Sequence, residues 1–306
     1  MIVITAPVHE FLIKSLSERG YKLLYEPAIT YEQLLDKVGE AEGLIVTTRL
    51  KIDKAILDRA VNLKWIGRLG SGLEQIDTAY AAGKNILCVS SPEGNRNAVA
   101  EHALGMLLSL MNNIPKAASE VKEGKWIRDR NRGIELTSKT VGLVGFGNTG
   151  QAFANLLHAF DVTILAYDRY KENFGSKLVR EANMEHICRY ADVISFHVPL
   201  TDETRNMAGA DFFNSLTQKP FILNTSRGSV VETSALVNAL KENKIAGAGL
   251  DVLENEKIDN LNELETGLLQ YLLHKENVLV TPHIAGYSHE SFLKMSQVIL
   301  QKLGIN

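Results

Sequence analysis

Short apolar segments alternate with amphipathic ones along most of the chain. Residues 2–4 and 43–46 have the length and the apolar composition of buried strands. Residues 54–60 repeat apolar side chains at helical spacing, and Asp53 stands where a helix N-cap is expected. Strands that alternate with helices form parallel sheets wrapped by those helices, so the pattern predicts an α/β protein.

The alternation runs in two series. The first contains strand candidates at residues 2–4, 23–25, 43–46, 63–66 and 86–89. The second begins near Thr140 and contains candidates at residues 141–145, 162–167, 191–196, 221–226, 247–252 and 277–282. Between the two series, residues 97–111 are apolar on nearly all sides, which predicts a buried helix. We expect the charged stretches at 120–133 and 254–267 to be exposed loops.

Composition and charge are those of an ordinary globular protein. The 306 residues suffice for two domains, and 33 basic against 36 acidic side chains give a net charge of −3. This balance indicates no nucleic-acid partner. We find no signal peptide and no apolar run of the ~18 residues that span a membrane. Two distant cysteines, Cys88 and Cys188, favour free thiols in a reducing compartment, with one disulfide as the alternative. We expect a cytoplasmic protein and assign no metal site.

Residues 145–150 read GFGNTG and match the pattern G-x-G-x-x-G. The pattern alone is weak, but a strand candidate precedes it, a helical segment follows it, and Asp168 ends the next strand candidate. Glycines allow a pyrophosphate to approach the backbone, and a helix N-terminus supplies N–H donors to it. We therefore predict a dinucleotide site that contains Gly145, Gly147 and Gly150.

Asp168 indicates which nicotinamide nucleotide binds. Its carboxylate can accept hydrogen bonds from a ribose diol and would repel a 2′-phosphate, so it favours NAD over NADP. Arg169 and Lys171 stand close by in the sequence and keep the use of NADP open. Because the fingerprint strand starts near residue 140, a whole α/β domain precedes the cofactor domain.

Arg227, Glu256 and His283 each follow a different strand candidate of the second series. Ligands bind at the carboxyl ends of parallel strands, so we expect the three side chains to meet beside the nicotinamide. A histidine transfers protons near neutral pH, a carboxylate stabilises its charged form, and an arginine grips a carboxylate with two N–H bonds. With a hydride donor, they suit the reduction of a 2-oxo acid. Each residue alone is more simply structural, so the hypothesis depends on their shared position.

Five motifs, in this order, resemble those of the D-isomer-specific 2-hydroxyacid dehydrogenase family. They are GLVGFGNTG, HVPLTDETRNM, NTSRGSVV, GAGLDVLENE and TPHIAG, and the resemblance extends over essentially the full chain. It implies that Arg227 binds the carboxylate and the keto oxygen of the substrate. It also implies that His283 is the acid/base and that Glu256 is its partner.

The resemblance implies further binding residues. Those for the cofactor, taken to be NAD, are Gly145, Gly147, Asn148, Thr149, Asp168, His197, Pro199, Thr204, Thr225 and Asp251. Backbone amides near Ser71 and Gly72, in GRLGSGLEQID, would complete the carboxylate site. Arg49 lies in TTRLK after a strand candidate and could reach a substrate phosphate, although a solvated loop explains it equally well.

The resemblance also implies an architecture of two Rossmann-like, doubly wound domains. We expect a flavodoxin-like substrate domain at residues 1–97 and 286–306, and an NAD-binding Rossmann domain at residues 98–285. Members of the family are usually dimers through the cofactor domain, so we expect a homodimer. The chain ends soon after His283, so we expect no C-terminal regulatory domain of the kind that some phosphoglycerate dehydrogenases carry.

The substrate is only weakly encoded in the sequence. We favour 3-phosphoglycerate and 3-phosphohydroxypyruvate. The alternatives are glyoxylate, hydroxypyruvate or another small D-2-hydroxy acid, as in D-lactate-type dehydrogenases. A different class also stays open, because NAD-binding corepressors share this fold and the Arg, Glu and His trio. In such proteins NAD would promote assembly and the recognition of partner peptides.

Overall fold

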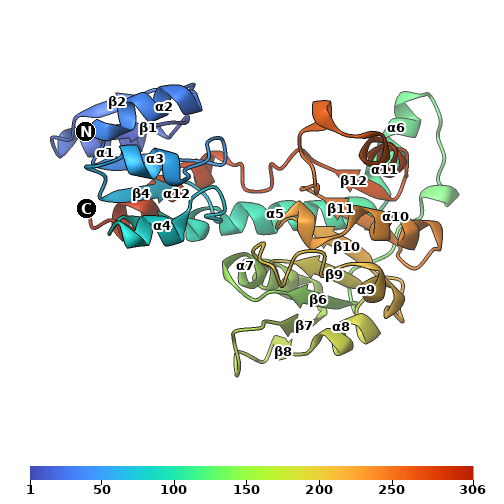
Figure 1. The fold of residues 1–306 in the computed structure, drawn as a ribbon. Helices are drawn as coiled ribbons and strands as arrows, with labels where there is room; N and C mark the ends of the chain where they lie inside the picture. Colours follow the sequence, from blue (N-terminus) through green and yellow to red (C-terminus); the bar gives the residue numbers. More distant parts are fainter. Residues whose placement is uncertain (306) are drawn as a thin grey trace. The chain divides into compact units, whose positions relative to one another are not determined.

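The structure is a computed structural model and describes residues 1–305. The chain divides into two compact units, each with its own sheet (Figure 1). Unit 1 consists of Met1–Ala98 and the C-terminal segment that starts at Gly286, and unit 2 consists of Val99–Ala285.

Unit 1 is built on a five-stranded sheet with the order β2-β1-β3-β4-β5. All neighbouring strands are parallel, which requires a crossover between each pair. This is the strand order of flavodoxin-like folds. The strands are β1 (Ile2–Ile4), β2 (Leu23–Tyr25), β3 (Gly43–Val46), β4 (Trp65–Arg68) and β5 (Leu87–Ser90).

Helices cover both faces of the unit 1 sheet. Side chains alternate along a strand, so Val3 packs into the cluster on one face while Ile2 and Ile4 pack into the cluster on the other. The Val3 face is covered by α2 (Tyr31–Lys37), α3 (Lys54–Arg59) and α4 (Thr78–Gly83). The opposite face is covered by α1 (Glu10–Glu18) and α12 (His289–Lys302). Asp53 caps α3 as predicted, through a hydrogen bond from the Ile56 N–H.

Unit 2 is built on a seven-stranded sheet with the order β12-β11-β10-β9-β6-β7-β8, again parallel throughout. The order reverses between β6 and β9, as in Rossmann folds. The strands are β6 (Thr140–Val144), β7 (Thr163–Tyr167), β8 (Val179–Glu181), β9 (Val193–Phe196), β10 (Phe221–Asn224), β11 (Gly247–Leu250) and β12 (Val278–Val280). The two parallel sheets confirm the predicted fold class.

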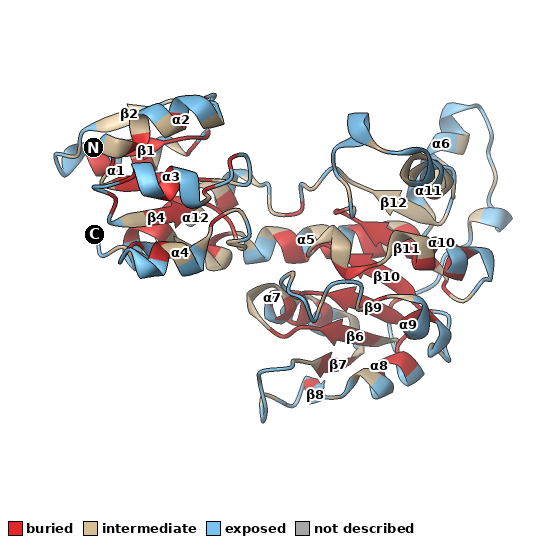
Figure 2. Ribbon diagram, viewed as in Figure 1, coloured by how far each residue is buried: buried red, intermediate tan, exposed pale blue. Residues whose placement is uncertain are grey.

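The sheet of unit 2 is also covered on both faces, and most of its central strands are buried (Figure 2). One face carries α5 (Pro92–Met111), of which residues from Val99 onward belong to unit 2, and α7 (Asn148–Leu157). The other face carries α8 (Met184–Tyr190), α9 (Ala210–Asn214), α10 (Thr233–Lys241) and α11 (Glu263–Leu273). A further helix, α6 (Ile114–Lys122), buries none of its residues.

Three elements differ from the sequence prediction. The last turn of α6 lies in the stretch 120–133 that we expected to be a loop, because the charged residues of that stretch indicated a solvated segment. Helix α11 begins inside the stretch 254–267, where Asn262 and Glu265 form a capping box that the acidic composition obscured. The short strand β8 was not predicted.

No helix in residues 1–305 is both long enough and apolar enough to cross a membrane. Cys88 and Cys188 are free thiols. Burial raises the pKa of both, so neither thiol is activated.

Candidate active site

The residues that the sequence analysis selected in unit 2 follow strands that end at one edge of its sheet. All strand pairs are parallel, so their carboxyl ends share that edge. The cofactor candidates come after β6, β7, β9, β10 and β11, and the catalytic candidates come after β10, β11 and β12. The reversal of strand order between β6 and β9 makes this edge the place where doubly wound sheets bind ligands.

His283 and Glu256 form a hydrogen-bonded pair at this edge. His283 Nδ1 lies 2.9 Å from Glu256 Oε2. A carboxylate oxygen only accepts hydrogen bonds, so Nδ1 carries a hydrogen and Nε2 is the nitrogen left to exchange a proton. The side chains are 40% and 45% exposed, so the pair is open to solvent. The structure thus brings together two of the three predicted catalytic residues in direct contact.

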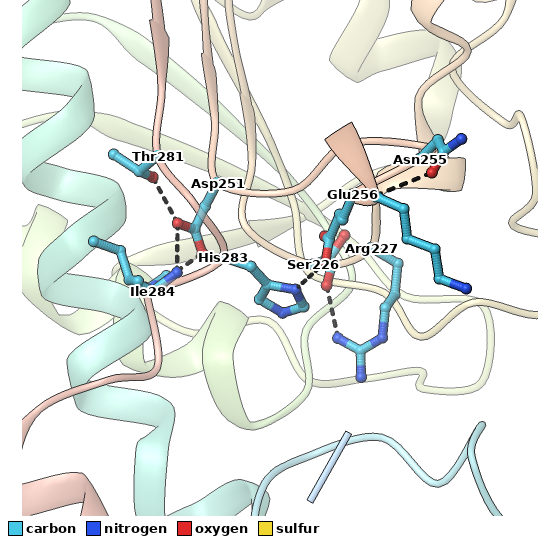
Figure 3. Close-up of polar contacts among 10 residues, drawn as sticks. Ser226, Arg227, Asp251, Asn255, Glu256, Thr281, His283 and Ile284 are labelled. Carbon is cyan, nitrogen blue, oxygen red and sulfur yellow. Dashed lines mark hydrogen bonds and ion pairs between the residues drawn. The ribbon is translucent and has the colours of Figure 1, made fainter. Parts of the chain in front are cut away.

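Arg227 lies on a loop that touches the loop leading to Glu256. Gly228 packs closely on Leu253, since a Cβ on Gly228 would lie 1.8 Å from the Leu253 carbonyl oxygen. The guanidinium donates from Nη1 to the Ser226 carbonyl oxygen at 2.7 Å. Figure 3 shows this guanidinium and the imidazole of the pair both on the lower side of their loops.

A buried carboxylate, Asp251, holds the loop that carries His283. Its Oδ1 accepts from Thr281 Oγ1 at 2.6 Å and from the Ile284 N–H at 2.9 Å, and its Oδ2 accepts from the Ala285 N–H at 2.8 Å (Figure 3). The His283 backbone is left-handed, with φ of 54°, and its N–H donates to the Asp251 carbonyl at 2.8 Å. Asp251 therefore grips the loop on both sides of the histidine.

The glycines of the fingerprint have different physical roles. Gly145 has φ of 97°, and a Cβ on it would lie 2.5 Å from the His197 carbonyl oxygen. A Cβ on Gly150 would lie 2.3 Å from the Gly145 carbonyl oxygen. Gly147 has φ of −82°, and a Cβ on it would meet no atom within 4 Å. The fold itself requires glycine at positions 145 and 150. Gly147 instead leaves open space at the N-terminus of α7 for a ligand.

Asp168 follows β7 and braces the glycine turn. Its Oδ2 accepts from the Phe146 N–H at 2.8 Å, and its Oδ1 accepts from the Tyr170 N–H at 3.0 Å. Each carboxylate oxygen has two lone pairs, so a ribose hydroxyl can still donate to this side chain. Asp168 therefore has a structural task in addition to the predicted one.

The two cations that kept NADP open are both engaged. Lys171 Nζ donates to the Phe146 carbonyl oxygen at 2.7 Å. Arg169 Nη2 lies 2.9 Å from Glu203 Oε1, and the Tyr170 hydroxyl donates to the other oxygen of that carboxylate at 3.1 Å. A 2′-phosphate would have to compete with Glu203 for the guanidinium.

Two buried polar atoms at this edge have no protein partner in residues 1–305: His197 Nδ1 and Thr225 Oγ1. His197 Nε2 lies 2.9 Å from Ser195 Oγ, and burial lowers the pKa of His197 to about 4, so the ring is neutral at pH 7. Buried polar atoms are normally hydrogen-bonded, so unpaired ones call for a ligand or a water. Together with the open space at Gly147, they fit a dinucleotide.

The remaining cofactor candidates surround the glycine turn. Asn148 and Thr149 form the first turn of α7. Pro199 and Thr204 lie in the loop after β9, where Thr204 Oγ1 donates to the Pro199 carbonyl at 2.6 Å. Their contact with a cofactor stays a prediction.

The predicted substrate residues Ser71, Gly72 and Arg49 belong to unit 1. They follow β4 and β3, at the carboxyl edge of that sheet. Ser71 Oγ donates to Asn95 Oδ1 at 3.1 Å, and Arg49 Nη2 donates to the Thr5 carbonyl oxygen.

Comparison with known proteins decides the family. Residues 104–285 match the family model of the D-isomer specific 2-hydroxyacid dehydrogenase, NAD binding domain. The chain belongs to this family. The matched residues include the glycine turn and all three catalytic candidates, so the predicted resemblance and the NAD-binding Rossmann unit are confirmed. The roles of individual residues stay predictions.

Relatives in the family carry several names. The chain is 35% identical, over 99% of its length, to D-3-phosphoglycerate dehydrogenase of Methanocaldococcus jannaschii, of which it covers 56%. It is 33% identical over 96% of its length to glyoxylate reductase of Thermococcus litoralis, of which it covers 92%. A solved structure of D-lactate dehydrogenase from Aquifex aeolicus, complexed with NAD and lactic acid, is similar with a TM-score of 0.86. It has 27% identity, over 99% of this chain and 94% of that one. The chain thus spans about half the length of the phosphoglycerate dehydrogenase relative.

The sequence analysis missed four residues that shape this family site. Thr281 and His102 contact the Asp251 carboxylate. Glu203 pairs with Arg169, and the Tyr170 hydroxyl donates to Glu203. His102 offered one signal, as a polar residue in the apolar helix α5. The other three are local contacts between loops, and no spacing in the sequence indicates them.

Proposed function

We propose that this protein is an NAD-dependent D-2-hydroxyacid dehydrogenase that interconverts a small 2-oxo acid and its 2-hydroxy acid. The observation that carries the proposal is the His283–Glu256 pair, 2.9 Å between Nδ1 and Oε2, on the same sheet edge as the dinucleotide fingerprint. A histidine with one nitrogen fixed by a carboxylate and the other free to exchange a proton is suited to acid/base catalysis.

In the direction of reduction, the hydride for C2 of the oxo acid would come from bound NADH. His283 Nε2 donates a proton to the oxygen that becomes the hydroxyl group. Glu256 stabilises the imidazolium form that must be present before this transfer. Arg227 holds the substrate carboxylate with parallel N–H bonds and stabilises negative charge on the keto oxygen.

The cofactor would be held by the elements around the glycine turn. The N-terminus of α7, with Gly147, would receive the pyrophosphate, and Asp168 would accept from the adenosine ribose. His197 Nδ1 and Thr225 Oγ1, both buried, are further polar atoms available to the nucleotide. The Arg169–Glu203 pair supports NAD as the preferred nucleotide.

For the substrate we propose 3-phosphohydroxypyruvate and 3-phosphoglycerate first. The relative from Methanocaldococcus jannaschii, named D-3-phosphoglycerate dehydrogenase, supports this choice. Unit 1 would be the substrate domain, in which amides near Ser71 and Gly72 bind the carboxylate and Arg49 binds the phosphate. Arg49 already donates to a backbone carbonyl oxygen, that of Thr5, and would have to release or share that bond.

A second candidate is reduction of glyoxylate or hydroxypyruvate. It is supported by the Thermococcus litoralis relative named glyoxylate reductase, to which the chain is 33% identical. A D-lactate-type activity is supported in the same way by the Aquifex aeolicus structure.

Steady-state kinetics with both nicotinamide nucleotides and a panel of acids tests the proposal. Phosphohydroxypyruvate, hydroxypyruvate, glyoxylate and pyruvate distinguish the substrates. His283→Ala should lower kcat by about 10²- to 10⁴-fold, while His274→Ala, at an exposed histidine of the same unit, should not. Unchanged turnover in His283→Ala would refute the mechanism. NADH binding without turnover of any acid would instead favour a corepressor-like binding protein.

We also propose that the protein is a cytoplasmic homodimer. The dimer is supported by large apolar side chains exposed on and after α6: Ile114, Val121, Trp126 and Ile134 are 48–81% exposed. Such a group is typical of a surface that another chain covers.

A further inference from the structure

Asp251, a predicted cofactor residue, meets two side chains that have no assigned role, Thr281 and His102, beside the loop that carries His283. Thr281 Oγ1 lies 2.6 Å from Asp251 Oδ1, and His102 Nε2 lies 3.0 Å from Thr281 Oγ1 and 3.6 Å from Asp251 Oδ1. The Asp251 side chain is 1% exposed and that of His102 is 22% exposed. The Asp251 carboxylate is therefore shielded from water by partly buried neighbours, and the cluster joins helix α5 to the loop after β12.

The direction of the hydrogen bonds follows from the number of hydrogens. A threonine hydroxyl has one hydrogen, and here the carboxylate of Asp251 must receive it because a carboxylate only accepts. Thr281 Oγ1 is then the acceptor in its contact with His102, so Nε2 of His102 carries a hydrogen and donates. The order is His102 to Thr281 to Asp251.

The Asp251 carboxylate in turn sets the loop that carries His283. It accepts from the backbone N–H of Ile284 and of Ala285, the two residues that follow the histidine. The histidine backbone is in the left-handed region, which costs about 1–2 kcal/mol for a residue other than glycine. Such a conformation persists only where its surroundings enforce it. If the carboxylate rotated, both N–H groups would lose their acceptor. The loop would then no longer hold the imidazole in its position.

We propose that Thr281 and His102 are positioning residues that orient the Asp251 carboxylate and thereby hold the His283 ring against Glu256. This inference rests on the proposed function, because it assumes that His283 exchanges the proton. It adds two residues, one of them on α5, to the set that determines the rate. Neither of them touches the reacting atoms.

Matched variants separate the hydroxyl from the volume of the side chain. Thr281→Val keeps the shape and removes the hydrogen bonds, and Thr281→Ser keeps the hydroxyl. His102→Leu removes the donor, and His102→Gln keeps an N–H at the same reach. We expect Thr281→Val and His102→Leu to lower kcat by about 10- to 100-fold, and the two conservative variants to stay within about 3-fold of wild type.

Amide hydrogen exchange provides a measurement that does not depend on turnover. The amides of residues 284 and 285 should exchange at least about 10-fold faster in Thr281→Val than in wild type and should recover in Thr281→Ser. Wild-type exchange rates in Thr281→Val would overturn the inference, and so would faster exchange with an unchanged kcat. If the wild-type protein reduces no 2-oxo acid, the proposed function fails, and exchange alone then tests whether Thr281 holds the loop. Thermal unfolding of each variant excludes a general loss of structure as the cause.

Discussion

At the scale of single residues, His197 couples the cofactor site to the stability of the fold. Burial lowers its pKa to about 4, whereas a histidine in an unfolded chain has a pKa of about 6.5. Between these two values the unfolded chain binds a proton that the folded chain does not. The free energy of unfolding should therefore fall as the pH drops from about 6.5 to about 4, and this contribution vanishes above pH 6.5.

The shift corresponds to a loss of about 3 kcal/mol between pH 7 and pH 4. Urea unfolding at the two pH values should show that His197→Gln loses less stability than wild type by roughly this amount. His186→Gln is the matched control, because His186 is exposed on α8. An equal loss in wild type and in His197→Gln would contradict the buried, neutral histidine.

Glu203 should control the choice between NAD and NADP. Its Oε1 lies 2.9 Å from Nη2 of Arg169, the residue that directly follows Asp168, the predicted ribose ligand. Replacing Glu203 with a neutral glutamine removes this ion pair. The Arg169 guanidinium is then available to bind a 2′-phosphate. Glu203→Gln should raise kcat/KM for NADPH relative to NADH by about 3- to 10-fold, and Glu185→Gln should leave the ratio unchanged. A constant ratio in Glu203→Gln would assign Arg169 no part in nucleotide choice.

The role of Asp168 was only partly predictable from the sequence. Asp168 was selected for a ribose, because the fingerprint pattern places an acid there. Its hydrogen bonds to the Phe146 and Tyr170 amides depend on the turn geometry, which no pattern encodes. A substitution of Asp168 would therefore loosen the glycine turn for both nucleotides, which makes Glu203 the sharper probe.

At the scale of elements, the glycines in the turn between β6 and α7 should differ in what they contribute, one to ligand binding and another to stability. Gly147→Ala should fold normally, because its Cβ meets no atom within 4 Å, but it should weaken NADH binding by about 10-fold or more, because the methyl group fills the approach to the backbone. Gly145→Ala should cost about 2 kcal/mol of stability, because its φ of 97° and the His197 carbonyl leave no room for a Cβ. NADH fluorescence titration and urea unfolding measure the two effects. Unaltered NADH affinity in Gly147→Ala would remove the pyrophosphate from this turn.

Elements with a strong hydrophobic signal were predictable, and those stabilised by local polar contacts were not. The buried strands could be read because parallel sheets covered on both faces need continuous apolar runs, as in residues 43–46 and 193–196. Strand β8 contains two charged residues among three and pairs only at the sheet edge, so it has no such run. Helix α6 does repeat apolar residues at helical spacing, at Ile114, Ala117 and Val121, but it buries none of them, and its last turn lies in a charged stretch that indicated a loop.

At the scale of the whole molecule, the proposed dimer predicts the effect of one surface charge. Trp126 is 81% exposed and follows α6, near Val121 in sequence, which is 51% exposed. Trp126→Glu should shift the mass measured by light scattering from dimer towards monomer, because a charge is costly to bury without a partner. Val61→Glu, at a 78% exposed position of unit 1, should not change the mass. A dimer that persists in Trp126→Glu would place the interface elsewhere.

Much of the candidate site was predictable because topology, rather than detail, assembles it. Once parallel strands were inferred, the residues after β10, β11 and β12 had to share an edge, which brought Glu256 and His283 within reach of each other. The same argument cannot rank 2-oxo acids, because the substrate tail depends on side-chain directions in loops. Arg49 illustrates this. Its place in the sequence predicted that it could reach a substrate phosphate, whereas in the structure its guanidinium donates to the Thr5 carbonyl oxygen.

The backbone of His283 places the imidazole at a position that is unfavourable for thermal stability. A left-handed φ of 54° suits glycine better than any side chain with a Cβ. His283→Gly and His283→Ala both lack the imidazole, yet the glycine variant should melt at a higher temperature, by an amount equivalent to about 1 kcal/mol. Where turnover is not required, glycine or asparagine at this position would give a protein of higher thermal stability that lacks the acid/base group.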